Sequence, residues 1–328
     1  MNTKPIYRVP LMKEIEEIPW NGFNVVSTFS GTGGSCLGYR MAGYRVLWAN
    51  EFIPAAQDSY KANHPNSILD RRDIREISAQ DILTATGLKI GEIDIFDGSP
   101  PCAAFSTAGK REAGWGKVKQ YSDTKQRVDD LFFEYARLIK GTQPKVFVAE
   151  NVSGLIKGTA KGYFLEILKT LKDCGYNVKC KVLDAQWLGV PQMRQRTIFV
   201  GVREDMGLDP VHPKPIEYRY SVKDALPWVD RCIIGNQDFE SIWGDSIVPN
   251  PTIMASGATK QSGVCEVDGI KRKYTIPELR RICAFPDDFI LAGTYAQQWE
   301  RLGRAVPPVM MSHIAKTIQL EILEKCVD

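Results

Sequence analysis

One cysteine stands directly behind two prolines in the segment DGSPPCAAFS, residues 97–106. Pro100 and Pro101 restrict the backbone and so fix the direction of the Cys102 side chain. The apolar run over residues 93–98 predicts a strand, so Cys102 would lie at the carboxyl edge of a sheet, where ligands of open α/β folds bind. A thiolate held there could act as a nucleophile, whereas the simplest alternative is a structural cysteine.

Two later segments add a carboxyl group and two guanidinium groups. AENVSG, residues 149–154, places Glu150 at the end of an apolar run, where burial favours the protonated form and the group could hold or donate a proton. The alternative is an acid that caps the following helix. VPQMRQRTIF, residues 190–199, places Arg194 and Arg196 two residues apart, hence on one face of an extended strand. Two guanidinium groups on one face could bind an anion or a base carbonyl. The alternative is that both arginines lie on a solvated edge of the sheet without a binding role.

A basic segment follows the cysteine. Residues 109–127 contain six Lys or Arg against two acids, together with several glycines. This composition suits a mobile loop that closes over a phosphate backbone. The net charge of the whole chain, +3, permits a nucleic-acid partner without requiring one.

A glycine-rich turn between a predicted strand and a predicted helix is the second candidate site. In FSGTGGSCLGYRMAG, residues 29–43, Gly31, Gly33 and Gly34 allow a tight turn. The N–H groups at the start of the helix could then bind a carboxylate or a phosphate. The glycines lack the full GxGxxG spacing of dinucleotide sites, and such patterns are weak evidence alone.

Further residues at successive strand ends suit an adenosine-containing ligand. Glu51, after the next strand, could accept hydrogen bonds from ribose hydroxyls, and Phe52 could stack on a base. Asp73 could accept one from an adenine amino group. Taken singly, these residues are as well explained by a surface acid and a core aromatic. Their order along the chain favours a cofactor that contains adenosine.

The composition bounds the class of protein. The 328 residues are 44% hydrophobic, with no apolar run long enough to span a membrane, and the first 20 residues do not resemble a signal peptide. Eight cysteines without a CxxC pair, and only three histidines, argue against a zinc site and a disulfide framework. We therefore expect a cytoplasmic protein, of a bacterial or phage-infected cell, without metal and without membrane contact. Nothing signals an oligomer, so a monomer is expected.

Short apolar runs alternate with helical patterns over the first two thirds of the chain, as in a parallel α/β sheet. The strands are expected at 23–29, 44–50, 93–98, 145–151 and 196–202, and the helices at 128–139, 162–176 and 310–325. Residues 204–274 are rich in Pro and Gly and predict a small irregular lobe. A capping box at 275–278 marks the return of helices. We expect one large α/β domain, 1–203 with 275–328, interrupted by a second unit, 204–274.

In sequence order, the motifs FSGTGG, GSPPCAAFS, ENVSGL, QMRQR and LGRAVPP resemble those of the DNA (cytosine-C5)-methyltransferases. The resemblance covers nearly the whole chain apart from the lobe at 204–274. It implies a Rossmann-like fold that uses S-adenosylmethionine, with the lobe as target-recognition region and double-stranded DNA as partner. A short lobe then implies a short recognition site.

The resemblance also implies a mechanism on a cytosine flipped out of the duplex. Cys102 would attack C6 of the ring, after which C5 would take the group carried by the cofactor sulfonium. Glu150 would engage N3 and the exocyclic amine, Arg196 would contact the base O2, and Arg194 would support the covalent intermediate. By the same resemblance the cofactor site comprises Phe29, Ser30, Gly31, Gly33, Gly34, Glu51, Phe52, Asp73, Ile74, Pro101, Leu131, Arg304, Ala305 and Val306.

Three residues depart from the family pattern. Ser27 stands where an aspartate is common before the glycine turn, and Ala103 stands where a glutamine usually follows the cysteine. Arg304 replaces a nearly constant asparagine in LGRAVPP. A cation about 4 Å from the cofactor sulfonium would repel it by ~4 kcal/mol at an effective dielectric of 20.

We therefore hypothesise that Arg304 selects carboxy-S-adenosylmethionine and that the product is 5-carboxymethylcytosine. The competing interpretation is that Arg304 pairs with an acid or a DNA phosphate and that the enzyme methylates normally. More distant alternatives are a tRNA cytosine-5 methyltransferase, a non-catalytic DNA-binding module and a nicotinamide oxidoreductase. The glycine-rich turn lacks the spacing expected of a nicotinamide oxidoreductase. A non-catalytic DNA-binding module would not need Cys102, Glu150 and Arg196 together.

Overall fold

The computed structural model describes residues 4–101, 119–121, 124–126, 130–156, 161–237, 240–257 and 262–326. Cys102, Ala103 and most of the basic segment 109–127 lie outside the described residues. The helix Ile276–Ile282 begins with the predicted capping box, because the Thr275 N–H donates to the Glu278 carboxylate over 2.8 Å.

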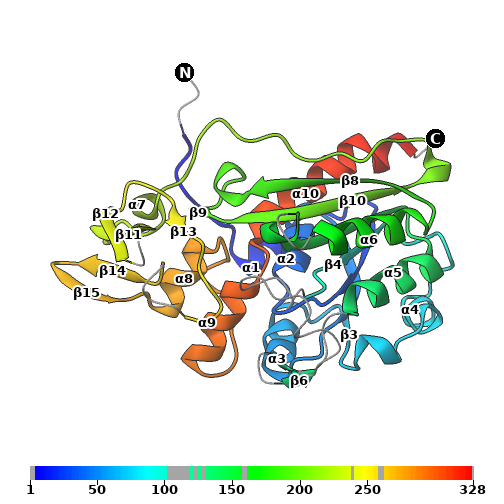
Figure 1. Ribbon diagram of the computed structural model, residues 1–328, viewed down its shortest axis with the longest axis horizontal. Helices are drawn as coiled ribbons and strands as arrows, with labels where there is room; N and C mark the ends of the chain where they lie inside the picture. The colour runs from blue at the N-terminus through cyan, green and yellow to red at the C-terminus, as the bar shows by residue number, and fades with distance from the viewer. Residues whose placement is uncertain are drawn as a thin grey trace.

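A seven-stranded sheet forms the centre of the large domain, with strand order β3-β2-β1-β4-β7-β10-β8 (Figure 1). Its strands are β1 Asn24–Thr28, β2 Arg45–Asn50, β3 Ile68–Asp70, β4 Ile95–Gly98, β7 Val146–Val152, β8 Tyr176–Asp184 and β10 Gln195–Arg203. The first five in spatial order are parallel, as predicted. β10 is antiparallel to both β7 and β8, so the expectation of a wholly parallel sheet was wrong at this edge. Apolar strand content does not encode strand direction.

Helices cover both faces of this sheet, each with its own apolar core. One face packs against α2 Gly34–Met41 and α10 Pro308–Glu321, and the other against α4 Ala79–Thr86, α5 Leu131–Thr142 and α6 Lys161–Lys172. In α5 the buried residues recur with helical spacing, which explains why the periodicity predicted it. The result is a three-layer arrangement, which confirms the predicted α/β fold class.

The lobe is more regular than its composition predicted. It contains a four-stranded antiparallel sheet of order β12-β11-β14-β15, formed by β11 Arg231–Gln237, β12 Glu240–Asp245, β14 Val264–Val267 and β15 Ile270–Lys273. The turn between β14 and β15 places Asp268 and Gly269 at positive φ, the conformation that an Asp-Gly pair favours in a hairpin. Figure 1 shows this sheet to the left of the large one.

A third apolar core joins the lobe strands to α8 Ile276–Ile282 and α9 Tyr295–Arg304. Its buried members include Cys232, Cys265, Leu279, Phe285 and Leu302. Further elements are α1 Met12–Glu16, α3 Pro54–Asn63, α7 Val222–Ala225, β5 Lys119–Tyr121, β6 Thr124–Gln126, β9 Gln192–Met193 and β13 Asn250–Pro251. In the described part of the chain, no helix combines the length and the apolarity that a membrane span needs.

Candidate active site

The glycine-rich turn connects β1 to α2 at the carboxyl edge of the sheet. Its backbone takes positive φ at Phe29, Gly31 and Gly33, which only glycine adopts without cost. A methyl group on Gly34 would overlap the backbone oxygen of Val306 and would lie 3.4 Å from Ala305 Cβ. The structure therefore brings the predicted residues of the turn and of the 304–306 segment into contact.

A buried carboxylate holds the far side of this turn. Glu51, only 7% exposed, accepts hydrogen bonds of 2.7 Å from the N–H groups of Gly31 and Ile53. Burial raises the pKa of Glu51, although these hydrogen bonds and the charge of Arg301 oppose the shift. Phe52 beside it is 37% exposed, so its ring is accessible.

The other residues predicted for the cofactor site lie in several different elements. Asp73 caps the 3₁₀ helix Ile74–Glu76 and pairs with Arg75 at 2.9 Å, so part of its acceptor capacity is already used. Ile74 and Leu131 are buried in the core below. Ser30 is buried in the turn, and Pro101 is partly exposed at the end of the described segment.

A carboxylate and a guanidinium meet on the neighbouring strands β7 and β10. Arg196 Nε lies 2.7 Å from Glu150 Oε1, and the two side chains are only 13% and 10% exposed. The segment after β4 is tied to the same place, because Asn151 Nδ2 donates to the Pro100 oxygen over 3.2 Å. The chain therefore enters the Cys102 segment beside this ion pair. Cys102 itself lies outside the described residues.

Arg194 is placed differently from Arg196. The strand is interrupted at Arg194, between β9 and β10, so the alternation that predicted a shared face does not apply. Its side chain is 1% exposed, and its guanidinium donates to the oxygens of Gly303, over 3.0 Å, and Ile253, over 3.4 Å. Burial lowers the pKa of Arg194 to about 9, and the charge of Arg196 acts in the same direction. Arg194 thus connects β10, the lobe and the end of α9.

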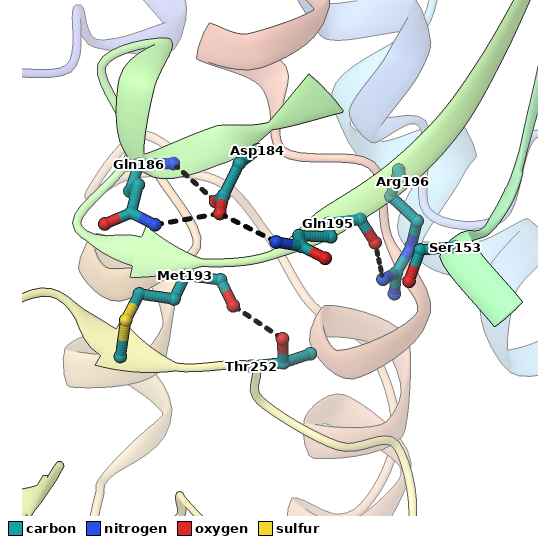
Figure 2. Close-up of a pocket in the computed structure, with 7 residues that line it drawn as sticks. All are labelled: Ser153, Asp184, Gln186, Met193, Gln195, Arg196 and Thr252. Atoms are coloured by element: carbon teal, nitrogen blue, oxygen red, sulfur yellow. Dashed lines mark hydrogen bonds between the residues drawn. The ribbon is translucent and has the colours of Figure 1, made fainter. Parts of the chain in front are cut away.

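A pocket of about 380 Å³ opens beside Arg196, between the large sheet and the lobe (Figure 2). It is lined by Ser153, Asp184, Gln186, Met193, Gln195, Arg196 and Thr252. Asp184 accepts hydrogen bonds from the side-chain amides of Gln186, over 2.8 Å, and Gln195, over 3.4 Å. Thr252 of the lobe donates to the Met193 oxygen over 2.7 Å. A polar pocket of this size at the edge of the ion pair can receive part of a nucleotide.

Arg304 is the last residue of α9 and has a carboxylate partner. Its Nε lies 2.8 Å from Glu300 Oε1, one helical turn earlier, and Arg301 lies 2.9 Å from the other oxygen of Glu300. Burial alone would raise the pKa of Glu300, but the charges of Arg301 and Arg304 lower it on balance. Two residues beyond Arg304, Val306 already contacts the glycine turn.

One buried acid in this region was not predicted from the sequence. Asp97 is 2% exposed in β4, and burial raises its pKa to about 7. An acid inside the apolar run IDIFDG was a visible signal for such a group. Among the described residues, no cluster of three or more His, Cys, Asp or Glu side chains could hold a metal ion.

The chain is similar to known proteins over most of its length. The family model of the C-5 cytosine-specific DNA methylases matches residues 23–227 and 217–320. The type II methyltransferase M1.HphI of Haemophilus parahaemolyticus is 30% identical over 89% of this chain and 86% of that protein. M.FnuDI of Fusobacterium nucleatum, also a type II methyltransferase, is 29% identical over 92% of this chain and 95% of its own length.

Solved structures show the same fold at lower identity. A protein described as a DNA modification methyltransferase encoded within a prophage of E. coli superposes with a TM-score of 0.68, at 22% identity, over 92% of this chain and 99% of that one. A mutant DNMT2 of Spodoptera frugiperda superposes with a TM-score of 0.67, at 17% identity, over 94% and 100%. The chain belongs to the C-5 cytosine-specific DNA methylase family.

Proposed function

We propose that the protein transfers a methyl group from S-adenosylmethionine to C5 of cytosine in double-stranded DNA. The observation that carries the proposal is the Glu150–Arg196 pair, enclosed at the carboxyl edge of the sheet where the chain enters the Cys102 segment. Membership of the family supports the DNA cytosine-5 methyltransferase activity.

The chemistry begins with a cytosine extruded from the duplex. The Cys102 thiolate forms a bond to C6, and the electron pair of the C5–C6 double bond moves toward C5. Arg196 binds the base O2, and Glu150 engages N3 and the amino group, so that the ring can carry the charge. The electron pair at C5 would then form a bond to the methyl group, while the bond from that methyl group to the cofactor sulfur breaks and leaves a neutral thioether. Loss of the C5 proton to a base and departure of the thiolate restore the aromatic ring.

The residues of the glycine turn fit the adenosyl cofactor. The hydroxyl of Thr32 is buried and has no hydrogen-bond partner among the described residues, which suits a polar ligand in the turn. Glu51 keeps acceptor sites for ribose hydroxyls, since an ionised carboxylate accepts about four hydrogen bonds. When bound, S-adenosylmethionine supplies an electrophilic methyl group on its sulfonium.

The pairing of Arg304 favours the ordinary donor over carboxy-S-adenosylmethionine. The carboxymethyl hypothesis assumed a cation that repels the sulfonium, but Glu300 places a carboxylate 2.8 Å from Arg304 Nε. That carboxylate, which Arg301 shares, reduces the repulsion, so Arg304 has a role that needs no carboxylated donor. Our proposal therefore takes 5-methylcytosine as the product, and 5-carboxymethylcytosine is the outcome that would reverse this choice.

The nucleic acid is taken as DNA because the relatives named above are type II methyltransferases that match over nearly the whole chain. A tRNA substrate remains the competing outcome. The pocket between the large sheet and the lobe, which lies beside Arg196, provides room for the strand that carries the extruded base.

One experiment tests reaction, donor and substrate together. Duplex DNA and tRNA are each incubated with the protein and either donor, and the nucleosides are weighed by mass spectrometry. We expect 5-methylcytosine in DNA with S-adenosylmethionine. Cys102→Ser should abolish the product and the covalent adduct with 5-fluorocytosine DNA, whereas Cys180→Ser, on β8, should retain both. Product formation by Cys102→Ser at the normal rate would refute the mechanism.

A further inference from the structure

The buried acid Asp97 has no part in the mechanism above, yet it lies beside the glycine-rich turn. β1 and β4 are parallel neighbours, and Ser27 and Asp97 face each other directly in their register. Both side chains are almost fully buried, at 0% and 2% exposure. The chain reaches Pro100, whose oxygen Asn151 holds, only three residues later.

Asp97 holds both ends of the glycine-rich turn. Ser27, at the end of β1, donates from Oγ to Asp97 Oδ2 over 2.9 Å. Tyr39, in the helix after the turn, donates from its hydroxyl to Asp97 Oδ1 over 3.2 Å. Ser30, within the turn, donates to the Ser27 hydroxyl over 3.1 Å, which extends the chain of hydrogen bonds into the turn. One carboxylate therefore fixes the strand before the turn and the helix after it.

The position of this acid explains the departure at Ser27. An aspartate is common at that position in the resembling motifs, and here its neighbour across the parallel register carries the carboxylate instead. Because the two Cα positions are adjacent in the sheet, a carboxylate from either strand can reach the same donors. A buried carboxylate is costly unless hydrogen-bonded, and Asp97 receives hydrogen bonds from Ser27 and Tyr39.

The surroundings of Asp97 make its charge sensitive to pH. The titratable groups that act on it, or on which it acts, are Tyr39 and Cys36 of α2, Tyr135 of α5 and Glu150 of β7. Burial raises its pKa most, and the charge of Glu150 adds to that effect, while the hydrogen bonds oppose it. Both Ser27 and Tyr39 donate to it, which is the arrangement that the ionised form requires.

We propose that Asp97 is the positioning acid of the cofactor site, supplying from β4 the carboxylate that holds the glycine-rich turn in its binding conformation. The inference rests on the proposed function, because it takes S-adenosylmethionine as the ligand of the turn. It concerns binding rather than methyl transfer, so it is measured without DNA.

Titration calorimetry of the full chain with S-adenosylmethionine tests this inference. Asp97→Asn should weaken binding about tenfold, the equivalent of one hydrogen bond to a charged group. Asp94→Asn is the matched control. Asp94 is also buried, at 4% exposure, but it directly precedes β4, at the end of the strand away from the glycine turn, and it pairs with Lys145. The control should bind normally. Between pH 8 and pH 6 the wild type should lose about tenfold in affinity, and Asp97→Asn should lose less.

The swap of the two residues provides the second arm. Asp97→Ser should bind at least as weakly as Asp97→Asn, and Ser27→Asp combined with Asp97→Ser should recover affinity to within about threefold of wild type. The inference is overturned if Asp97→Asn binds like wild type, if Asp94→Asn weakens binding equally, or if the swap is no better than Asp97→Ser. Failure of the wild type itself to bind S-adenosylmethionine would instead refute the proposed function.

Discussion

Replacing each of two neighbouring arginines by lysine should separate stability from chemistry. Arg194 donates to the oxygens of Gly303 and Ile253 from a fully buried position, whereas Arg196 pairs with Glu150 at the edge of the pocket. Lysine keeps the charge of either residue but not the planar fork that reaches two acceptors. Both variants carry the same substitution, at positions two residues apart in the sequence.

The structure gives the expected magnitudes. In Arg194→Lys at least one of the two carbonyl oxygens is left without its donor inside the protein, which costs about 1–3 kcal/mol. The charge stays buried, so no gain in solvation offsets this loss. In Arg196→Lys an ammonium can still pair with Glu150, and the unfolding free energy should change by under about 1 kcal/mol. Its rate of methyl transfer should fall about 100-fold, because the donor to the base O2 is displaced.

Urea unfolding followed by tryptophan fluorescence measures the first quantity, and initial rates of methyl transfer to duplex DNA measure the second. We expect Arg194→Lys to lower the unfolding free energy by about 2 kcal/mol. Its rate per folded molecule should change little at a temperature where both variants are folded. If Arg194→Lys unfolds like the wild type and its rate falls as steeply as that of Arg196→Lys, then Arg194 acts in the chemistry and our reasoning from its burial is wrong.

Three further outcomes follow from the same geometry. Gly34→Ala should destabilise the protein by about 1–3 kcal/mol in thermal melts, because the added methyl group overlaps the Val306 oxygen. Gly235→Ala is the comparison, since its added methyl group would lie 3.9 Å from the end of the Ile242 side chain, an ordinary contact. Glu300→Gln should raise the Kd for S-adenosylmethionine several-fold, because the charge of Glu300 no longer offsets that of Arg304. An unchanged Kd would show that the Arg304–Glu300 pair does not affect binding of the donor. The raised pKa of Asp97, about 7, means that the folded state holds this proton more tightly than the unfolded state. The unfolding free energy should therefore fall between about pH 4 and pH 7, by at most about 4 kcal/mol, and Asp97→Asn should flatten that slope in urea titrations at each pH.

Much of the large domain could be predicted because burial on both faces makes parallel strands nearly continuous apolar runs. β1, β2, β4, β7 and β10 were found in this way. Strand direction was not, since an apolar run reads alike in either direction, and the antiparallel β10 was therefore taken as parallel. β8 was not predicted. Only one of its faces is covered, so its buried residues alternate with exposed ones near its start, at Tyr176 and Val178, and do not form a continuous apolar run.

The site was predictable in its residue types but not in its pairings. Spacing alone could not show that Arg196 meets Glu150 while Arg194 turns into the interior, because that depends on the interruption between β9 and β10. The partner of Arg304 was visible in the sequence, since Glu300 precedes it by four residues and helical side chains four apart are neighbours. The Asp-Gly pair in the lobe was an equally visible hairpin signal.

Buried charged side chains connect the glycine turn and the lobe to neighbouring parts of the chain. Asp97 fixes the glycine turn from β4, and the same strand leads to the segment that Asn151 holds beside Glu150. Arg194 binds the lobe at Ile253 and the end of α9 at Gly303 with a single guanidinium. A movement of the lobe on binding DNA must therefore carry the Gly303 backbone with it or break a buried hydrogen bond. Because Arg304 follows Gly303 directly, and Val306 contacts the glycine turn, the Gly303 backbone connects the lobe to the proposed cofactor site by direct contacts.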